Sequence, residues 1–320
     1  MCYALAAGHA GRVLARPLFV AAALFCLTPW ASPGLALALG MLLALTVENP
    51  FVRSSRPVAR YSLQVSVVLL GFGMNLGAVA KSGERGMGLA LLTISGTFVL
   101  AFLLAGWLRV PERVSTLIAA GTAICGGSAI AAVSAVVDAA EAEMSVAMGT
   151  VFLLNAVALY LFPRLGHALG LTQTQFGTWA GMAIHDISSV VGAASVYGLS
   201  ALQTATAVKL SRALWIVPVA LLAGWKFGTR EGAARRVQIP WFIGCFVLAS
   251  LARTLLPPLA AWGADLSRVA VTGLTLTLFL IGAGLSRATL RAVGARPLLL
   301  ALLLWLAIGL GSLEAVRWLH

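Results

Sequence analysis

Charged residues are scarce in this 320-residue chain. They make up 10% of the sequence, and only ten of them are acidic, whereas roughly a quarter of a soluble globular chain is charged. Apolar residues make up 60%, with 33 glycines besides, and the mean hydropathy is +0.97. This composition excludes a soluble enzyme, a nucleic-acid-binding protein and a disordered regulator. The net charge of +12 is therefore attributed to membrane topology, because Lys and Arg gather in cytoplasmic loops.

Sequence motifs for soluble chemistry are also missing. The four cysteines show neither CxxC spacing nor a histidine partner pattern, so no disulfide framework and no metal site is expected. The chain has no GxxxxGK[ST] phosphate loop, and no cofactor is expected. No loop between apolar segments exceeds about sixteen residues, which leaves no room for a nucleotide-binding or receptor domain. We therefore expect the function to lie within the bilayer.

The apolar segments predict the fold class: an all-α polytopic membrane protein with about eleven transmembrane helices in one integral membrane domain, 1–320. A bilayer core of about 30 Å needs about 20 helical residues. Charges, prolines and glycines divide the chain into eleven segments, near 17–30, 33–47, 61–80, 87–108, 114–137, 143–163, 174–199, 201–224, 238–257, 266–285 and 296–318. The first two are short, and three interpretations stay open: a tilted hairpin, one interrupted helix, or a cleaved signal peptide.

Positive charge predicts the orientation of these segments. With eleven spans, 15 basic residues fall on the side of the N-terminus and five on the other. The positive-inside rule then places the N-terminus and the loop 225–237 in the cytoplasm and His320 outside. Fusing the first two segments weakens the asymmetry to 13 against seven, so eleven spans is the preferred count.

Two adjacent glycines, Gly126 and Gly127, interrupt the fifth segment. Glycine costs about 1 kcal/mol relative to alanine within a helix, so we predict a break there. Unwound backbone at this depth would line a site, and the free N–H groups of the second half-helix would face an anion. The alternative is close helix packing through small residues. The predicted substrate-binding residues are Cys125, Gly126, Gly127 and Ser128.

An adjacent histidine and aspartate lie near the middle of the seventh segment. Histidine titrates near neutral pH, so His185 and Asp186 could carry protons. If the helix is continuous, His185 shares a small polar face with Gly177 and Gly181. The alternative is an internal lock that only holds helices together. The predicted ion- or proton-coupling residues are His185, Asp186, Ser188 and Ser189.

Lys209 and Arg212 lie three residues apart in the eighth segment and share a helix face. They fall on the outer side of the membrane, where the positive-inside rule does not account for positive charge. Snorkelling of Lys209 to the interface is the alternative. Two cations against one aspartate leave a net positive interior, which favours an anionic substrate. We therefore add Lys209 and Arg212 to the predicted substrate-binding residues.

The chain resembles the sulfate exporter family of bacterial inner-membrane proteins over about 61–320, most densely over 117–212. The matching motifs are Ala120–Ala132, Phe176–Gly181 with Ile184-His185-Asp186, Lys209–Arg212, Val68–Leu76 and Ile281–Ser286. The resemblance implies a fold similar to the bile acid symporters and sodium/proton antiporters, with inverted five-helix repeats and two crossing discontinuous helices. It implies an N-terminal extra helix over 1–32, repeats over 33–163 and 174–318, and a second break near Thr275–Gly282 in the tenth segment.

The sequence thus predicts a secondary transporter, not an enzyme, that exports a small anion such as sulfate, a sulfonate or a carboxylate by alternating access. The expected partners are that anion, protons or sodium, the bacterial inner membrane and, as an open alternative, a second copy in a homodimer. Nucleic acid is not expected. Two other interpretations remain: a membrane-embedded enzyme using His185 and Asp186, although no nucleophile–base or HExxH pattern is present, and a channel or non-transporting subunit.

Overall fold

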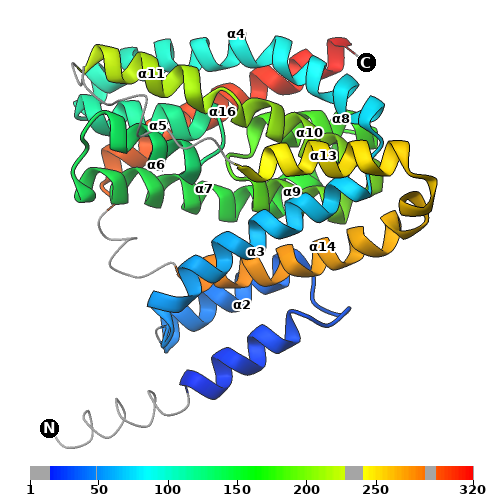
Figure 1. The fold of residues 1–320 in the computed structure, drawn as a ribbon. Helices are drawn as coiled ribbons and strands as arrows, with labels where there is room; N and C mark the ends of the chain where they lie inside the picture. Colours follow the sequence, from blue (N-terminus) through cyan, green and yellow to red (C-terminus); the bar gives the residue numbers. More distant parts are fainter. Residues whose placement is uncertain (1–14, 48, 228–240, 285–292, 320) are drawn as a thin grey trace, which may run out of the picture. The chain divides into compact units, whose positions relative to one another are not determined.

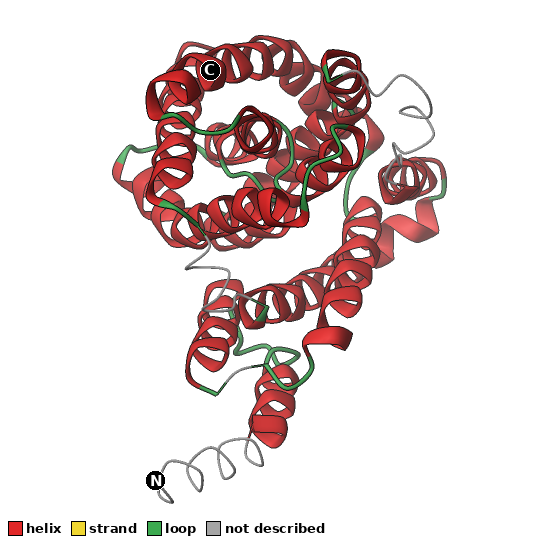
Figure 2. Cartoon of the chain, turned by 90° about the vertical axis from the view of Figure 1, so that its left-hand side faces the viewer, coloured by secondary structure: helices red, strands yellow, loops and turns green. Residues whose placement is uncertain are grey.

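The computed structural model describes residues 15–47, 49–227, 241–284 and 293–319. Within these ranges the chain is all helical and contains no strand, as Figure 2 shows. Five helices are long and apolar enough to cross a membrane, at Leu89–Leu108, Glu141–Ala168, Leu199–Lys226, Ala261–Ala283 and Ala295–Trp318, and shorter apolar helices accompany them. The structure thus confirms the all-α class and agrees with a membrane protein. The predicted loop 225–237 lies mostly outside the described residues.

The chain divides into two compact units, 1–75 with 244–290 and 76–243 with 291–320. The first unit contains a helix over Ala15–Phe25, followed by α2 (Pro33–Thr46), α3 (Val52–Phe72), most of α13 (Trp241–Leu255) and α14 (Pro257–Ala283). The second unit contains α4 to α11 and α16, and every predicted site residue lies in it.

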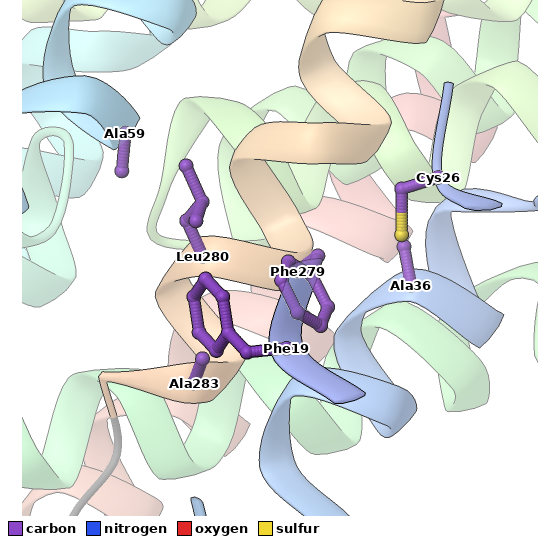
Figure 3. Close-up of a cluster of buried hydrophobic side chains, with 7 residues drawn as sticks. All are labelled: Phe19, Cys26, Ala36, Ala59, Phe279, Leu280 and Ala283. Atoms are coloured by element: carbon purple, nitrogen blue, oxygen red, sulfur yellow. The ribbon is translucent and has the colours of Figure 1, made fainter. Parts of the chain in front are cut away.

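In the first unit, α14 packs against both α2 and α3 (Figure 1). Small residues allow this: a Cβ on Gly282 would lie 2.5 Å from the carbonyl oxygen of Leu37, and one on Gly40 would lie 2.8 Å from the backbone nitrogen of Ala283. Such close backbone approach is typical of helix packing in membranes. Figure 3 shows the apolar cluster beside this contact, in which Phe19 packs on Phe279 with ring centroids 5.1 Å apart.

The predicted break near Thr275–Gly282 is wrong, because α14 is continuous from Pro257 to Ala283. The hydroxyls of Thr275 and Thr277 donate to Val271 and Gly273 within the same helix. The glycines of this helix serve close packing, as described for Gly282, so nothing leaves the backbone unwound.

In the second unit, two of the predicted segments fold into pairs of short helices, besides the brief interruption at Leu214 and Trp215 between α10 (Leu199–Ala213) and α11 (Ile216–Lys226). The predicted break in the fifth segment is confirmed: α5 (Glu112–Ala123) and α6 (Gly127–Val136) are separated by Ile124, Cys125 and Gly126. The seventh segment is also interrupted, since α8 (Gln173–Ala183) and α9 (Ile187–Tyr197) are separated by Ile184, His185 and Asp186. The small polar face predicted for a continuous seventh helix therefore ends at the second interruption.

Both interrupted segments fold back on themselves. We call 112–136 hairpin 1 and 173–197 hairpin 2. In hairpin 1, a Cβ on Gly121 would lie 2.8 Å from Ile130 Cδ1, so the two arms are in contact. In hairpin 2, the ring of Tyr197 stacks on Phe176 with centroids 3.8 Å apart, so the end of α9 lies beside the start of α8. The first and last residues of each hairpin therefore lie close together at its base, and the interruption between its two helices forms its tip.

The two hairpins approach from opposite ends of α7 (Glu141–Ala168). Ser134, near the end of hairpin 1, donates to the sulfur of Met144 in the second turn of α7. His167, in the last turn of α7, stacks on Tyr197 at the base of hairpin 2, with centroids 4.2 Å apart. Between these ends, Asn155 reaches the tip of hairpin 2, because its Oδ1 accepts from the backbone N–H of His185 at 3.1 Å.

The segment formed by α10 (Leu199–Ala213) and α11 (Ile216–Lys226) runs past both tips in the direction opposite to α7. It starts at the base of hairpin 2, where Ser200 N–H donates to Gln173 Oε1 at 3.0 Å. It ends at the base of hairpin 1, where Lys226 pairs with Glu112 at 2.6 Å. Two further helices, α4 (Leu76–Leu108) and α16 (Ala295–Leu319), pack against α5 and α8 respectively (Figure 1).

Candidate functional site

The tips of the two hairpins meet inside the second unit. Gly126 has a φ of +69°, a conformation that disfavours residues with a Cβ. A Cβ added there would lie 3.4 Å from the Cα of Asp186 and 3.4 Å from the carbonyl carbon of His185. The backbone conformation therefore favours glycine at this position, and the opposing tip lies within van der Waals contact of it. Gly127 faces Phe152 instead of the opposing tip.

Asp186 is the N-cap of α9. Its Oδ2 accepts from the N–H groups of Ser188 at 3.1 Å and Ser189 at 3.3 Å, and from the Ser188 hydroxyl. A carboxylate at a helix N-terminus satisfies orphan N–H groups and interacts favourably with the helix dipole. The structure therefore gives Asp186, Ser188 and Ser189 a shared position at the start of one hairpin arm.

Lys209 and Arg212 reach the two tips from α10. Lys209 Nζ donates to the carbonyl oxygen of Ile184, at the tip of hairpin 2, at 2.6 Å. Arg212 donates from Nη2 to the carbonyl oxygen of Ala123, at the tip of hairpin 1, and from Nη1 to Thr93 Oγ1 of α4 at 2.8 Å. Both side chains are completely buried, with 0% exposure, which excludes snorkelling of Lys209 to the interface in this conformation.

No carboxylate pairs with either cation among the residues that the structure describes. Asp186 is close enough for its charge to act on Lys209, but its carboxylate forms its hydrogen bonds with the start of α9. It makes no ion pair with Arg212. Two buried cations therefore lie at the tips, and the carboxylate of Asp186 bonds the start of α9 and neither cation.

Several buried polar atoms around the tips have no hydrogen-bond partner. They are Arg212 Nε, both ring nitrogens of His185, the Nδ2 of Asn155 and Thr122 Oγ1. Buried donors without partners are rare, and each needs an explanation such as a bound ion or water. Arg212 Nε and Asn155 Nδ2 can only donate. The tip region therefore has more hydrogen-bond donors than acceptors, just as it has more positive than negative charge.

Cys125 and Ser128 lie together at the tip of hairpin 1, where the Cys125 sulfur and the Ser128 oxygen are 2.7 Å apart. Ser128 is exposed, whereas Cys125 is buried. The structure thus brings together all the predicted site residues: one group at the tip of hairpin 1, one at the tip of hairpin 2, and the two cations beside both. Within the described ranges, no three His, Cys, Asp or Glu side chains come together as metal ligands would.

Sequence reasoning missed the relationship between the two tips, although a signal for it exists. Ala120-Gly121-x-Ala123-Ile124-x-x-x-Ser128 and Ala180-Gly181-x-Ala183-Ile184-x-x-x-Ser188 match at a constant offset of 60 residues. In the structure these stretches occupy equivalent places, the end of the first arm and the start of the second. The contributions of Thr93 and the Ala123 carbonyl were also missed, because both depend on contacts between segments distant in the sequence.

Comparison with known proteins shows a family that extends over most of the chain. The family model described as Conserved hypothetical protein 698 matches residues 16–301. A UPF0324 membrane protein of Bacteroides thetaiotaomicron is 47% identical over 294 residues, covering 90% of this chain and 87% of that protein. A UPF0324 membrane protein of Bdellovibrio bacteriovorus is 46% identical over 312 residues, covering 96% of each chain. One from Shewanella oneidensis is 46% identical over 303 residues, covering 95% of each chain.

No solved structure matches the chain. The extent of these similarities shows that the chain belongs to the UPF0324 membrane protein family.

Proposed function

We propose that this UPF0324 family member is a secondary transporter that carries a small anion by alternating access, outward and coupled to protons or sodium. The observation that supports the proposal best is the pair of buried cations, Lys209 and Arg212, that lie at the meeting point of two hairpin tips without a paired carboxylate. The sulfate-exporter resemblance belongs to the same proposal, with sulfate, a sulfonate or a carboxylate as candidate substrates.

Electrostatics favours an anion over a cation or a neutral solute. An intramembrane cation costs several kcal/mol and is normally paired or part of a transport pathway. Lys209 and Arg212 contribute two positive charges and Asp186 one negative charge, so the tip region has a net charge of about +1 by this count. A bound anion would neutralise that charge and give acceptors to Arg212 Nε and Asn155 Nδ2. His185, with both ring nitrogens unpaired, is the group we assign to proton coupling.

The hairpins offer a route for alternating access. Hairpin 1 and hairpin 2 have their bases at opposite ends of α7, and their tips meet beside the cations. Displacement of one tip would open the site toward one side of the membrane, and displacement of the other toward the opposite side. Discontinuous elements at the membrane midplane are typical of binding sites in transporters.

The repeat and topology predictions take a modified form. We infer that α4, hairpin 1 and α7 form one repeat, and that α16, hairpin 2 and α10–α11 form its inverted counterpart, in place of repeats over 33–163 and 174–318. Eleven apolar segments would then comprise nine crossings and two re-entrant hairpins. Only Arg164 changes side, so the basic residues divide 14 to six. The positive-inside rule still favours a cytoplasmic N-terminus and an outside C-terminus in the bacterial inner membrane. A homodimer stays an open alternative.

Two other functions make different predictions. A membrane-embedded enzyme acting through His185 and Asp186 would form product in detergent, where no gradient exists. A channel would conduct without saturation, and a non-transporting subunit would give no flux. The Asp186 carboxylate accepts hydrogen bonds from the start of α9. It is therefore not arranged as an acid–base pair with His185, which argues against the enzyme.

A binding measurement tests the proposal. The full-length protein, purified in detergent, is heated with the sodium salts of sulfate, methanesulfonate, acetate or chloride at constant ionic strength. A ligand that binds only the native state must raise the melting temperature. We expect sulfate or acetate to do so in the parent and not in Lys209→Gln or Arg212→Gln. If no anion stabilises the parent, or both variants respond as the parent does, the proposed site is wrong.

A further inference from the structure

The two hairpin tips differ at one pair of equivalent positions. The 60-residue repeat aligns Asp186 of hairpin 2 with Gly126 of hairpin 1, and Ser188 with Ser128. Asp186 and Gly126 are the N-cap residues of α9 and α6, respectively. The same structural position therefore carries a carboxylate on one tip and no side chain on the other.

This difference leaves the start of α6 without the cap that α9 has. The first N–H groups of any α-helix lack partners within the helix. In hairpin 2 the Asp186 carboxylate accepts from two of them and from the Ser188 hydroxyl. Within the described residues of hairpin 1, the N-cap of α6 makes no such side-chain bond. Ser128, the counterpart of Ser188, is exposed, so a ligand can reach this end of the helix.

At this tip the Cys125 carbonyl oxygen accepts from the Ser128 hydroxyl at 3.3 Å, and a second acceptor is the Cys125 sulfur. The sulfur lies 2.7 Å from the Ser128 oxygen and also interacts with the N–H of Ala129. A thiol sulfur is a weak acceptor compared with a carboxylate oxygen. It therefore leaves the N-terminus of α6 with the positive end of the helix dipole largely unneutralised.

Arg212 points independently to an anion at the same place. Its guanidinium is completely buried and donates to the carbonyl oxygen of Ala123, three residues before Gly126. Its Nε has no partner. An unpartnered, fully buried donor thus lies at the tip whose second arm lacks a cap.

We propose that the anionic oxygens of the ligand occupy, on hairpin 1, the place that the Asp186 carboxylate occupies on hairpin 2. They accept from the backbone N–H of Ser128, from its hydroxyl in place of the Cys125 carbonyl oxygen to which it now donates, and from Arg212 Nε. The ligand is an oxyanion with at least two acceptor oxygens, as in a carboxylate, sulfonate or sulfate group. Hairpin 2 is capped by its own side chain, whereas hairpin 1 is completed by the ligand. Ser128 is therefore a determinant of specificity. This inference rests on the proposed function.

Substitutions of Ser128 test the inference in the full-length protein, with sodium sulfate, acetate and chloride as probes. Ser128→Ala removes one donor to a charged ligand, so the affinity for sulfate or acetate should fall about tenfold or more. Ser128→Asp supplies a carboxylate to the start of α6. We expect it to raise the melting temperature without any added anion and to abolish the shift that sulfate or acetate causes. Chloride, with no second acceptor atom, should bind the parent more weakly than either.

Ser134→Ala is the matched control, because Ser134 lies on the same helix, near its other end, and bonds Ala131 and Met144. It should keep the parental affinity. If Ser128→Ala and Ser128→Asp also keep that affinity while Arg212→Gln loses it, the ligand binds the cation and not the hairpin, and this inference is overturned while the proposed function survives. If the parent shows no shift with any probe, both are wrong. Should Ser128→Asp fail to fold, Ser128→Ala alone decides.

Discussion

The guanidinium of Arg212 donates a hydrogen bond to the carbonyl oxygen of Ala123, 89 residues away in the sequence. Three residues earlier on α10, Lys209 makes the corresponding contact with Ile184. One face of α10 thus contacts the tips of both hairpins through two cations. The same cations would attract a substrate anion. Under the proposed function the same two side chains hold the tips and bind the anion, so substitutions there should affect stability as well as ligand affinity.

Replacement of Arg212 should be costly. Arg212→Gln removes the charge and leaves at least one of the acceptors on Ala123 and Thr93 without its donor. An unsatisfied buried group costs about 1–3 kcal/mol, so we expect a melting temperature lower by several degrees and no stabilisation by anions. Thermal unfolding monitored by tryptophan fluorescence measures both.

Arg317→Gln is the control for that variant. Arg317 is half-exposed and lies 3.6 Å from Glu314, and a surface ion pair contributes about 0–1 kcal/mol. Its melting temperature and anion response should match those of the parent. An Arg212→Gln protein as stable as Arg317→Gln would show that the tip contacts do not hold the hairpins.

Asp186 should act as a helix cap. Asp186→Ala removes the acceptor for Ser188 and Ser189, and loss of an N-cap costs about 0.5–2 kcal/mol. Thr172→Ala, at the N-cap of α8, should cost a similar amount far from the tip. We expect both to lower the melting temperature, and only Asp186→Ala to change transport, because it alone loosens a tip. Equal transport in the two variants would contradict a role for the hairpin 2 tip.

Asp186→Asn and Arg212→Gln should have additive effects on stability. Neighbours that form an ion pair show coupling in a double-mutant cycle, but Asp186 bonds the start of α9 and Arg212 bonds Ala123 and Thr93. A coupling energy above about 1 kcal/mol would contradict independent roles and would show that the two residues interact, directly or through the contacting tips.

Close packing between α8 and α10 should depend on Gly181. A Cβ there would lie 2.9 Å from the carbonyl oxygen of Ala205, so Gly181→Ala must push two backbones apart, at a cost of about 1–3 kcal/mol. Gly96→Ala on α4 is the matched control, since a Cβ on Gly96 meets nothing within 4 Å. Thermal unfolding should show a lower melting temperature for Gly181→Ala alone. A neutral Gly181→Ala would mean that these helices can separate freely.

The re-entrant path of hairpin 1 predicts that its two ends face the same side of the membrane. Single cysteines at Glu112 and Glu141, in a background without native cysteines, should both react with an impermeant maleimide only in inside-out vesicles. Eleven alternating spans would instead expose the cysteine at 141 to the outside of intact cells. Labelling of that cysteine from outside would contradict the hairpin topology.

The sequence predicted the parts of the fold that depend on local composition. Helix content, the break at Gly126 and the positions of the buried cations all follow from apolar length, glycine and charge. The second break could not be found this way, because Ile184-His185-Asp186 contains no glycine or proline and Asp186 stabilises the interruption by capping α9. Conversely, Gly282 suggested a break from the sequence, but it lies in a continuous helix and allows that helix to pack against α2.

The fold-back of the hairpins depends on contacts that no local pattern specifies. Tyr197 stacks on Phe176 and bonds the carbonyl oxygen of Leu171, 26 residues away. Hydrophobicity alone cannot distinguish such a hairpin from a spanning helix, since both bury apolar residues over a similar length. The repeat between the two tips does give a sequence signal, but it consists of five identical residues within a nine-residue stretch.

Transport into proteoliposomes tests the central claim most directly. Reconstituted parent protein should give saturable uptake of radiolabelled sulfate or acetate that requires an imposed proton or sodium gradient, and Lys209→Gln should abolish it while remaining folded and inserted. We predict saturable flux in the parent and no flux in Lys209→Gln, which lacks the charge. Absence of flux from the parent for every oxyanion that stabilises it, or an equal rate in Lys209→Gln, would contradict an anion transporter built on the buried cations.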